Sequence, residues 1–544
     1  EKFERSLRTW QEIEKLFEDQ QALESLLRGK GLAVEEPEGG PIDPAKDQAE
    51  FDWGLPPVPF AASRTWTNRE SKKISARCVG VGDGQVDLIL GKNRNSTVPL
   101  EKLSEADQHY ATIWKQLRED FQPRPAHIPD LTSVSAAVWE SDAQELGRDN
   151  DTRLWKYRTE SFEFECDVKL EKDELQSASR QFEIVNRAIP ALGLVPKPKS
   201  PPEKFFRVRL FSERRAYREA GGPPGSAGVF FIDHKDKDKI GVSFVSMQNL
   251  GTGNDPQGSL STLLHETTHQ VMHHQLRNLP MWAVEGLADY IGSREYKRDE
   301  LRFPVPANDL DSYYQRKLGR DWGGKIRWKK PSEVMGFSQR KFMGAPDPAG
   351  RPAPGPPGAR AIPVLPRQPM PNHNVTSNYV CSMLLVNFLL HHDGPEGAER
   401  FATYLENFAA GMIDAQLYLD AYNEAVDTHN EAIQECSKVA QAFNAAMLSY
   451  DQKLHQYGHD LAAFELGAGD RSNPPIQPGL PNPAKFEIVK PVPPRILKTP
   501  RLQQDISPSN IEKRARAILL NGRSQDEFDT LVKETYLGLG LDLT

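Results

Sequence analysis

The chain has 544 residues, of which 38% are hydrophobic and 26% are charged, and its formal net charge is −8. This composition supports packed cores and excludes global disorder, and the length suggests roughly three or four domains of about 150 residues. The negative charge, without a long Lys/Arg run, argues against nucleic acid or an anionic membrane as the main partner. No apolar run approaches the ~18 residues of a membrane-spanning helix. We therefore predict no nucleic-acid partner and no transmembrane segment.

The chain begins at Glu1 rather than Met, and we interpret it as a trimmed or mature protein. Any export signal would already have been removed, so its absence says nothing about export. Its cysteines are widely scattered and form no C-x-x-C pair, which excludes a zinc knuckle and a dense disulfide scaffold. A single disulfide stays open as an alternative. The cysteines are Cys78, Cys166, Cys381 and Cys436.

The N-terminal region is predicted to be one amphipathic helix followed by a linker. Between residues 3 and 28, apolar side chains recur at or near helical spacing. The stretch that follows, up to residue 59, is rich in Pro, Gly and acidic residues, a composition typical of linkers. We expect a helical segment over 1–34 and a linker over 35–59.

Residues 60–118 change to a β pattern. The runs ISARCVGV, QVDLIL and STVPL are typical of short strands, and Gly82-Asp83-Gly84 indicates a tight hairpin turn between the first two. With its RTWT, GDG and VPLEKLS motifs, this segment resembles the Sla-type SH3-like domain. The resemblance implies a small β-barrel that binds a protein or envelope partner or acts as a spacer. A purely structural appendage is the alternative.

Residues 119–150 are expected to be a second linker, and residues 151–413 an α+β domain. The strand-like runs YRTESFEFECDV and KFFRVRLF flank a helical pattern, LQSASRQFEIVNRAIPAL. Two further strand-like runs, AGVFFID and KIGVSFVSM, come directly before the helix that carries the motif described below. A Pro/Gly-rich stretch at 344–372 indicates an exposed loop within the domain.

The last part of the chain is mostly helical. Residues 414–466 show a long helical pattern, which predicts either one long helix or a helical hairpin, and a Pro-rich connector follows up to residue 500. We expect 414–508 to be a helical insertion with its connector. Residues 509–544 are expected to form the helical end of the preceding α+β domain.

The main chemical signal is His265-Glu266-Thr267-Thr268-His269, an H-E-x-x-H motif. On a helix, residues four apart are offset by only about 40° and one turn, so both imidazoles point the same way and can bind one zinc ion. Glu266 lies about 100° around the helix, beside the ion, where a general base is needed. We predict His265 and His269 as zinc ligands and Glu266 as the catalytic base.

A second short helix is predicted for residues 281–292, MWAVEGLADYIG, after the helix breaker RNLP. Glu285 and Asp289 are four residues apart on it and share a face. A catalytic zinc takes three protein ligands and keeps one position open, so Glu285 is the predicted third ligand. Asp289 is predicted to hold the outer nitrogen of a ligating histidine.

The combination of HETTHQ and PMWAVEGLADY resembles the gluzincin metallopeptidases, in particular the bacterial peptidase-MA-like branch whose third-ligand helix reads W-x-x-E-G-x-A-x-Y. The resemblance covers about residues 155–411 and the final helix. It implies a thermolysin-like domain, one Zn²⁺ per chain and a peptide or protein substrate. It also implies export to the periplasm or surface of a bacterium, and an edge strand beside the active helix, supplied by SAGVFF or GVSFVSM, that would bind an extended peptide.

Other histidines near the motif are interpreted as lying outside the ligand set. A metzincin site is excluded because Met272 and Gln275 occupy the positions where that motif needs Gly and His. His273 lies about 12 Å from His265 along the helix axis, too far to share the ion. We interpret His273 and His274 as surface residues or as neighbours of the ligands.

Peptide hydrolysis also needs a donor to the oxyanion of the transition state. In related gluzincins this donor is a Tyr or His from elsewhere in the chain. Tyr379, in TSNYVCSMLLVNFLL, is the candidate because it opens a helix downstream of the third ligand. The alternative is that Tyr379 only packs.

The sequence thus predicts a multidomain α+β protein in which an SH3-like barrel precedes a gluzincin-type zinc peptidase domain with a helical insertion. We expect a secreted, periplasmic or cell-surface zinc peptidase. Two alternatives stay open. One is an envelope-associated binding or adaptor protein with a relic peptidase domain, which the retention of all five site residues argues against. The other is a zinc hydrolase of a non-peptide bond, such as an epoxide.

Overall fold

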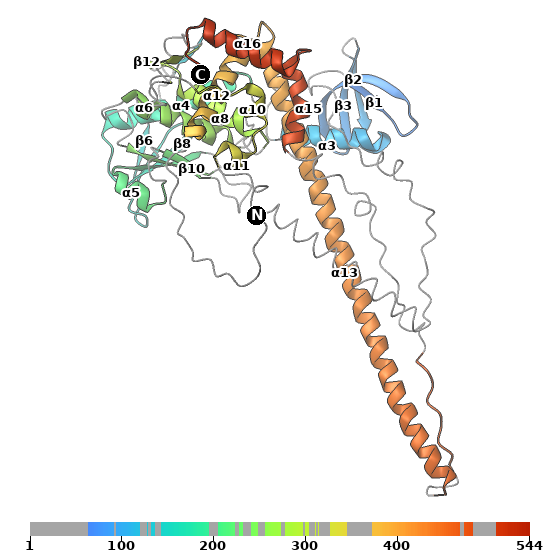
Figure 1. Ribbon diagram of the computed structural model, residues 1–544. Helices are drawn as coiled ribbons and strands as arrows, with labels where there is room; N and C mark the ends of the chain where they lie inside the picture. The colour runs from blue at the N-terminus through green and yellow to red at the C-terminus, as the bar shows by residue number, and fades with distance from the viewer. Residues whose placement is uncertain are drawn as a thin grey trace. The chain divides into compact units, whose positions relative to one another are not determined.

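The computed structural model describes residues 64–91, 94–119, 128, 132–135, 143–194, 205–222, 228–231, 241–247, 256–273, 278–297, 300–303, 310–311, 314, 327–344, 373–467, 473–481 and 508–543. The predictions for 1–34, 35–59 and nearly all of the loop 344–372 lie outside these residues. The chain divides into two compact units, Glu1–Asp52 with Gln416–Arg501 and Trp53–Ala415 with Leu502–Thr544. The protein is a mixed α+β structure (Figure 1).

The first described elements form an antiparallel sheet with the order β1-β2-β3-β4. The predicted hairpin turn is confirmed, because Gly82 pairs with Gln85. Asp83 and Gly84 between them have φ of 49° and 72°, the positive values that this two-residue turn requires. The elements are β1 (Arg64–Thr67), β2 (Lys73–Gly82), β3 (Gln85–Leu90), β4 (Arg94–Pro99), the 3₁₀ helix η2 (Leu100–Lys102) and α3 (Glu105–Glu119).

The predicted barrel is not closed. Among the residues described, β1 and β4 do not pair, and one isolated bridge between Asn68 and Leu103 joins the two ends of the sheet. The chain turns into η2 directly after β4, so no further strand runs back along β1. The fully buried Trp66 forms the centre of this small core, with its Nε1–H donating to Ala76 O at 3.0 Å. Helix α3 covers it through the ring of Tyr110.

A larger sheet has six strands in the order β10-β11-β9-β8-β7-β6. Strands β8, β9 and β11 run parallel, and the other neighbours are antiparallel. Strand β6 lies within 119–150, so the prediction of a linker is wrong for these residues. The strands are β6 (Gln144–Arg148), β7 (Trp155–Arg158), β8 (Phe162–Cys166), β9 (Phe206–Phe211), β10 (Gly228–Phe231) and β11 (Val242–Ser246).

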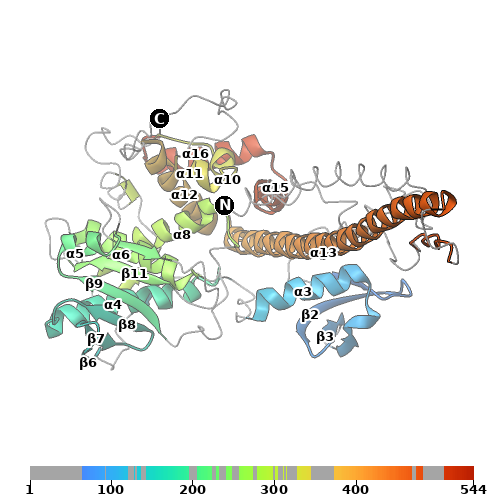
Figure 2. The same cartoon turned by 90° about the horizontal axis from the view of Figure 1, so that it is seen from below.

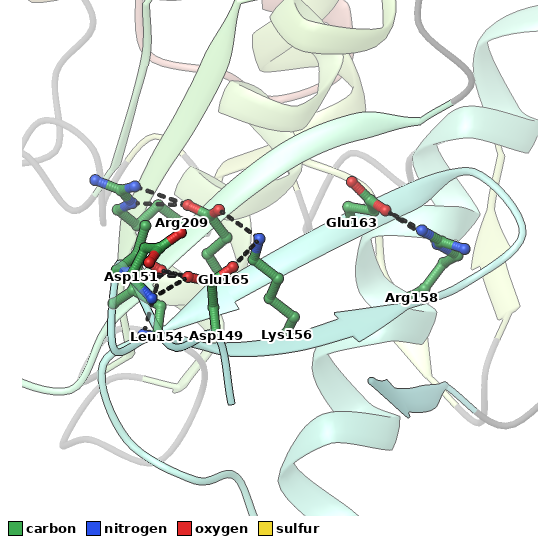
Figure 3. A network of polar contacts seen from close by, with 9 residues as sticks. Asp149, Asp151, Leu154, Lys156, Arg158, Glu163, Glu165 and Arg209 are labelled. Atoms are coloured by element: carbon green, nitrogen blue, oxygen red, sulfur yellow. Dashed lines mark hydrogen bonds and ion pairs between the residues drawn. The ribbon is translucent and has the colours of Figure 1, made fainter. Parts of the chain in front are cut away.

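The two faces of this sheet differ because successive side chains of a strand point to opposite sides. On one face, residues such as Phe164 and Val208 are buried in the main core. The other face carries charged side chains that pair across the strands (Figure 3). The pairs include Arg209–Glu165 at 2.7 Å, between β9 and β8, and Lys156–Asp149 at 2.8 Å, between β7 and the turn before it. The alternation of apolar and charged side chains along the strands therefore decides which face of the sheet the helices cover.

Helices α4 (Lys172–Ala191) and α6 (Pro256–Val271) pack on the apolar face and on each other. Helix α8 (Met281–Gly292) packs on α6, and α12 (His373–His391) packs on α8, so the helices form successive layers (Figure 2). The remaining elements of this unit are α5 (Arg214–Glu219), α10 (Pro331–Met335), α11 (Gln339–Phe342), α15 (Pro508–Leu520), α16 (Gln525–Gly538) and a small sheet of β5 (Ser133–Ser135), β12 (Tyr296–Lys297) and β13 (Glu300–Arg302).

Helix α13 (Gly397–Glu465) is one unbroken helix (Figure 1). Of the two predicted alternatives, the single long helix is therefore confirmed. It begins before residue 414 and so runs across the expected start of the insertion. None of the helices described has the length and apolarity of a membrane span. All four cysteines are free.

The C-terminal helices are joined to the core by buried ion pairs. Asp393, in the turn after α12, accepts hydrogen bonds from Arg523 at 2.6 Å and from Arg400 at 2.8 Å, and its side chain is 2% exposed. Arg523 lies between α15 and α16, and Arg400 lies in α13. One carboxylate therefore connects three helical segments around α12.

Replacing Asp393 by Ala is expected to lower the free energy of unfolding by about 3 kcal/mol, because it leaves two arginines in a largely buried site without their anion. Glu396→Ala is the matched control. Glu396 pairs with the same Arg400 at 3.7 Å but is 81% exposed, so it should change stability by less than about 0.5 kcal/mol. Urea unfolding of both variants measures the difference, and equal midpoints would show that this connection carries no stability.

Candidate metal centre

Helix α6 presents two imidazoles to one point. His265 and His269 have ring centroids 4.7 Å apart and ring planes at 86°, and their Nε2 atoms are 3.0 Å apart. The helix can carry this polar face within the core because Thr267 and Thr268 donate their hydroxyls back to the carbonyls one turn earlier, at 2.8 and 2.7 Å. These two buried hydroxyls of α6 are thus satisfied within the helix.

Helix α8 approaches α6 and α12 closely through two glycines. A Cβ on Gly286 would lie 2.7 Å from Ser382 O in α12, and a Cβ on Gly292 would lie 2.7 Å from Ser261 O in α6. A side chain at either position would push the helices apart. This close packing brings Glu285, the residue before Gly286, to the histidine pair.

Three ligand atoms meet where the helices cross. Glu285 Oε2 is 3.3 Å from His265 Nε2 and 3.4 Å from His269 Nε2. Ligands at ~2.0–2.1 Å around a tetrahedral zinc are separated by about 3.3 Å, so these atoms have the spacing of a zinc ligand set. They form the one group of three or more His, Cys, Asp or Glu in the described residues that could hold a metal ion.

The residues also fit a zinc ion because one of the three ligand atoms lacks a hydrogen-bond donor. Glu285 Oε2 is buried and accepts no hydrogen bond from any residue described. A buried carboxylate oxygen without a donor is costly, and a cation relieves that cost. Two imidazoles and one carboxylate are also a donor set of catalytic zinc sites, which leave the fourth position open.

Asp289 contacts the ring nitrogen of His265 that faces away from the ligand group. Its Oδ1 is 2.7 Å from His265 Nδ1, and its side chain is 1% exposed. The carboxylate accepts a hydrogen bond from Nδ1–H, so the tautomer that leaves Nε2 free to bind a metal is favoured. Asp289 thus lies where the sequence predicted it.

The ionisable groups of the site change one another's pKa values. Burial disfavours the protonated form of His265, but the Asp289 carboxylate outweighs burial and raises the pKa of the imidazole to about 10. Burial also disfavours the carboxylate form of Glu285, yet the neighbouring imidazoles lower its pKa far below the ordinary value. The surrounding charges therefore favour a positive charge between the three ligand atoms, either a proton or a metal ion.

Glu266 lies beside the ligand group and outside it. It contacts the edge strand β10, where the backbone N–H of Phe230 bonds its carboxylate and a Cβ on Gly228 would lie 3.3 Å from its Cγ. Burial raises the pKa of Glu266 above its ordinary value. A carboxylate with a raised pKa next to a metal site has the properties of a general base.

Tyr379 lies close to the same group. Its ring centroid is 6.3 Å from that of His265, and its hydroxyl donates to Met343 Sδ at 3.5 Å. Burial raises its pKa most, and the charges of Glu285, Asp289 and Glu266 raise it further, so the hydroxyl stays protonated. The structure thus brings Tyr379 to the site from α12.

Two contacts of the site were not predicted from the sequence. They are the hydrogen bond from the Phe230 backbone to Glu266 and the contact of Met343 with the Tyr379 hydroxyl. The sequence named the strand SAGVFF as a candidate neighbour of the helix, but neither residue type indicates these contacts. His273 does not join the ligand group, as predicted. However, it is buried against Phe206 rather than at the surface, because it faces the sheet; His274 lies outside the described residues.

Comparison of the chain with known proteins found no match. No protein-family model, no curated protein and no solved structure matches this chain. The site is therefore interpreted from its own geometry.

Asp289→Asn is expected to weaken zinc binding about 10–100-fold, because the amide removes the charge that orients and polarises His265. Competition with a chromogenic chelator measures the affinity. Asp414→Asn is the matched control, since Asp414 makes the same kind of contact with His109, at 2.8 Å, away from the ligand group. Equal losses in both variants would contradict a specific role for Asp289.

Proposed function

We propose that this chain is a zinc-dependent peptidase of the gluzincin type, in which His265, His269 and Glu285 bind one Zn²⁺. The observation that carries the proposal is the convergence of three ligand atoms at 3.0–3.4 Å. The resemblance of the H-E-x-x-H and W-x-x-E-G-x-A-x-Y motifs to that family agrees with it. The overall mixed α+β structure is compatible with it.

Zinc, when bound, polarises the scissile carbonyl and makes water a stronger nucleophile. Glu266 takes the proton of the attacking water at its carboxylate and later passes it to the leaving amine. Burial raises its pKa, which makes the carboxylate a stronger base than an exposed glutamate. The Tyr379 hydroxyl, kept protonated, donates a hydrogen bond to the developing oxyanion.

The substrate is proposed to bind as an extended peptide beside β10. This strand is at the end of the six-stranded sheet and packs against α6. Of the two predicted segments, SAGVFF contains this edge strand, whereas GVSFVSM contains β11, which lies between β10 and β9. An edge strand offers backbone groups to a peptide with little dependence on its sequence.

The remaining assignments belong to the same proposal. Residues 60–118 are proposed to be an SH3-like module that binds a protein or envelope partner, supported by the antiparallel sheet around Trp66 and by the RTWT and VPLEKLS motifs. The family resemblance supports a secreted, periplasmic or cell-surface location.

Glu266→Gln is expected to retain the zinc content of the wild type and to lose about 10²–10⁴-fold in the rate of peptide cleavage, since only proton transfer is removed. Elemental analysis measures the zinc, and a quenched peptide library with and without chelator measures cleavage. Glu163→Gln, on the charged face of the sheet, is the control. A wild-type chain that binds zinc but cleaves no peptide would contradict the peptidase proposal and favour a non-peptide substrate or a binding role.

Tyr379→Phe is expected to lower kcat about 10²–10³-fold with little change in KM, because the hydroxyl acts on the oxyanion and not on the bound substrate. The melting temperature and the zinc content should stay close to those of the wild type. A variant that loses stability and keeps kcat would show that Tyr379 only packs.

A further inference from the structure

A second histidine pair lies on α13. His455 and His459 have Nε2 atoms 3.3 Å apart, ring centroids 4.8 Å apart and ring planes at 87°. The pair at His265 and His269 has almost the same geometry, with corresponding values of 3.0 Å, 4.7 Å and 86°. Two imidazole nitrogens at this separation share a proton or a cation, and the spacing suits two ligands of one tetrahedral ion.

The second pair by itself offers too few ligands for a metal ion. No third His, Cys, Asp or Glu joins it in the described part of the chain, where the His265 group is the only set of three or more. A tetrahedral ion bound by two imidazoles therefore keeps two positions open. A two-fold axis through the ion would fill them with the same two imidazoles of a second copy.

The residues around the pair form a stripe suited to such an axis. Leu448, His455, His459 and Leu466 are seven, four and seven residues apart, which at ~100° per residue places them within about 40° on the helix. Both leucines are exposed, Leu448 by 65% and Leu466 by 84%. Leu466 follows the last residue of α13, but its N–H still donates to Ala462 O at 3.0 Å, so the helical direction continues.

The opposite side of α13 is less exposed. Residues spaced alternately four and three apart are buried or half-buried there, as in a coiled-coil seam. They are Phe443, Met447, Tyr450, Leu454, Tyr457, Leu461 and Phe464. The stripe of Leu448 and the histidines lies on the far side of the helix and faces solvent.

The stripe is also symmetric about the level of Tyr457. The histidines lie two residues to either side, and the leucines lie nine residues to either side. In an antiparallel pairing with a two-fold axis at this level, His455 meets the second copy's His459, and Leu448 meets the second copy's Leu466. We propose that this stripe is a dimer interface between two copies of the chain, bridged by one zinc ion or a similar late first-row divalent ion bound to four imidazoles.

Sedimentation of the untagged full chain in zinc chloride and in chelator tests the proposal. Zinc is expected to shift the mass from that of the 61.2 kDa monomer to twice that value, and His455→Ala/His459→Ala should stay monomeric. The double variant should also bind about half an equivalent of zinc less per chain than the wild type. This difference does not depend on how much zinc the site at His265 binds.

The matched control is Gln456→Ala/Asp460→Ala. These two exposed residues lie on the same turns of α13 as the histidines but outside the stripe, and Gln456 Nε2 donates to Asp460 Oδ1 at 2.8 Å. This variant should dimerise like the wild type. A dimer that survives the histidine changes, or zinc binding at the pair without dimerisation, would overturn the proposal.

The antiparallel register has its own test. Leu448→Lys and Leu466→Glu should each weaken the zinc-dependent dimer, because each places a charge opposite a leucine. The chain with both changes should regain it, since every new Lys then faces a Glu of the second copy. Failure of the double change to restore the dimer would overturn the proposed pairing.

Discussion

The contact between His265 Nδ1 and Asp289 is the interaction on which the rest of the site depends. At 2.7 Å it joins α6 to α8, aims one ring nitrogen at the ligand group, and places a carboxylate within the core. A buried carboxylate is tolerated only with a partner of opposite charge or a hydrogen-bond donor. The pair therefore keeps the helices in the one arrangement that also brings Glu285 to the histidines.

That arrangement is supported from the side away from the sheet. Trp282, in the first turn of α8, donates to Tyr404 Oη at 3.3 Å, and Tyr404 donates to Glu512 in α15 at 3.4 Å. Glu512 in turn pairs with Arg516. A row of buried polar groups thus connects the helix of the third ligand to the C-terminal helices. Residues more than two hundred positions from the motif contribute to its rigidity, which a site of sub-ångström precision needs.

The two histidine pairs show which properties of a pair come from helix spacing and which come from its tertiary surroundings. Both arise from the same i,i+4 spacing on a helix, which is why their ring geometries agree so closely. The surroundings differ completely. One pair faces a buried glutamate and an aspartate, and the glutamate adds a third candidate ligand atom. The other pair is exposed, and we propose that a second copy of the chain completes it. Spacing alone creates a bidentate face, and the surroundings decide what that face can bind.

Local patterns in the sequence determined much of this protein: the hairpin at Asp83-Gly84, the alternating strands, the helix α8 with its ends, and the shared faces of His265 with His269 and of Glu285 with Asp289. These features depend on residues within one or two turns, so spacing and turn chemistry suffice to predict them. The tertiary structure decided the rest. The open sheet around Trp66, the strand β6 in a supposed linker, the choice of β10 as the edge, and the meeting of Glu285, Tyr379 and the Phe230 backbone at α6 all join segments far apart in the chain. Such contacts depend on how buried faces pack, and no short-range periodicity records them.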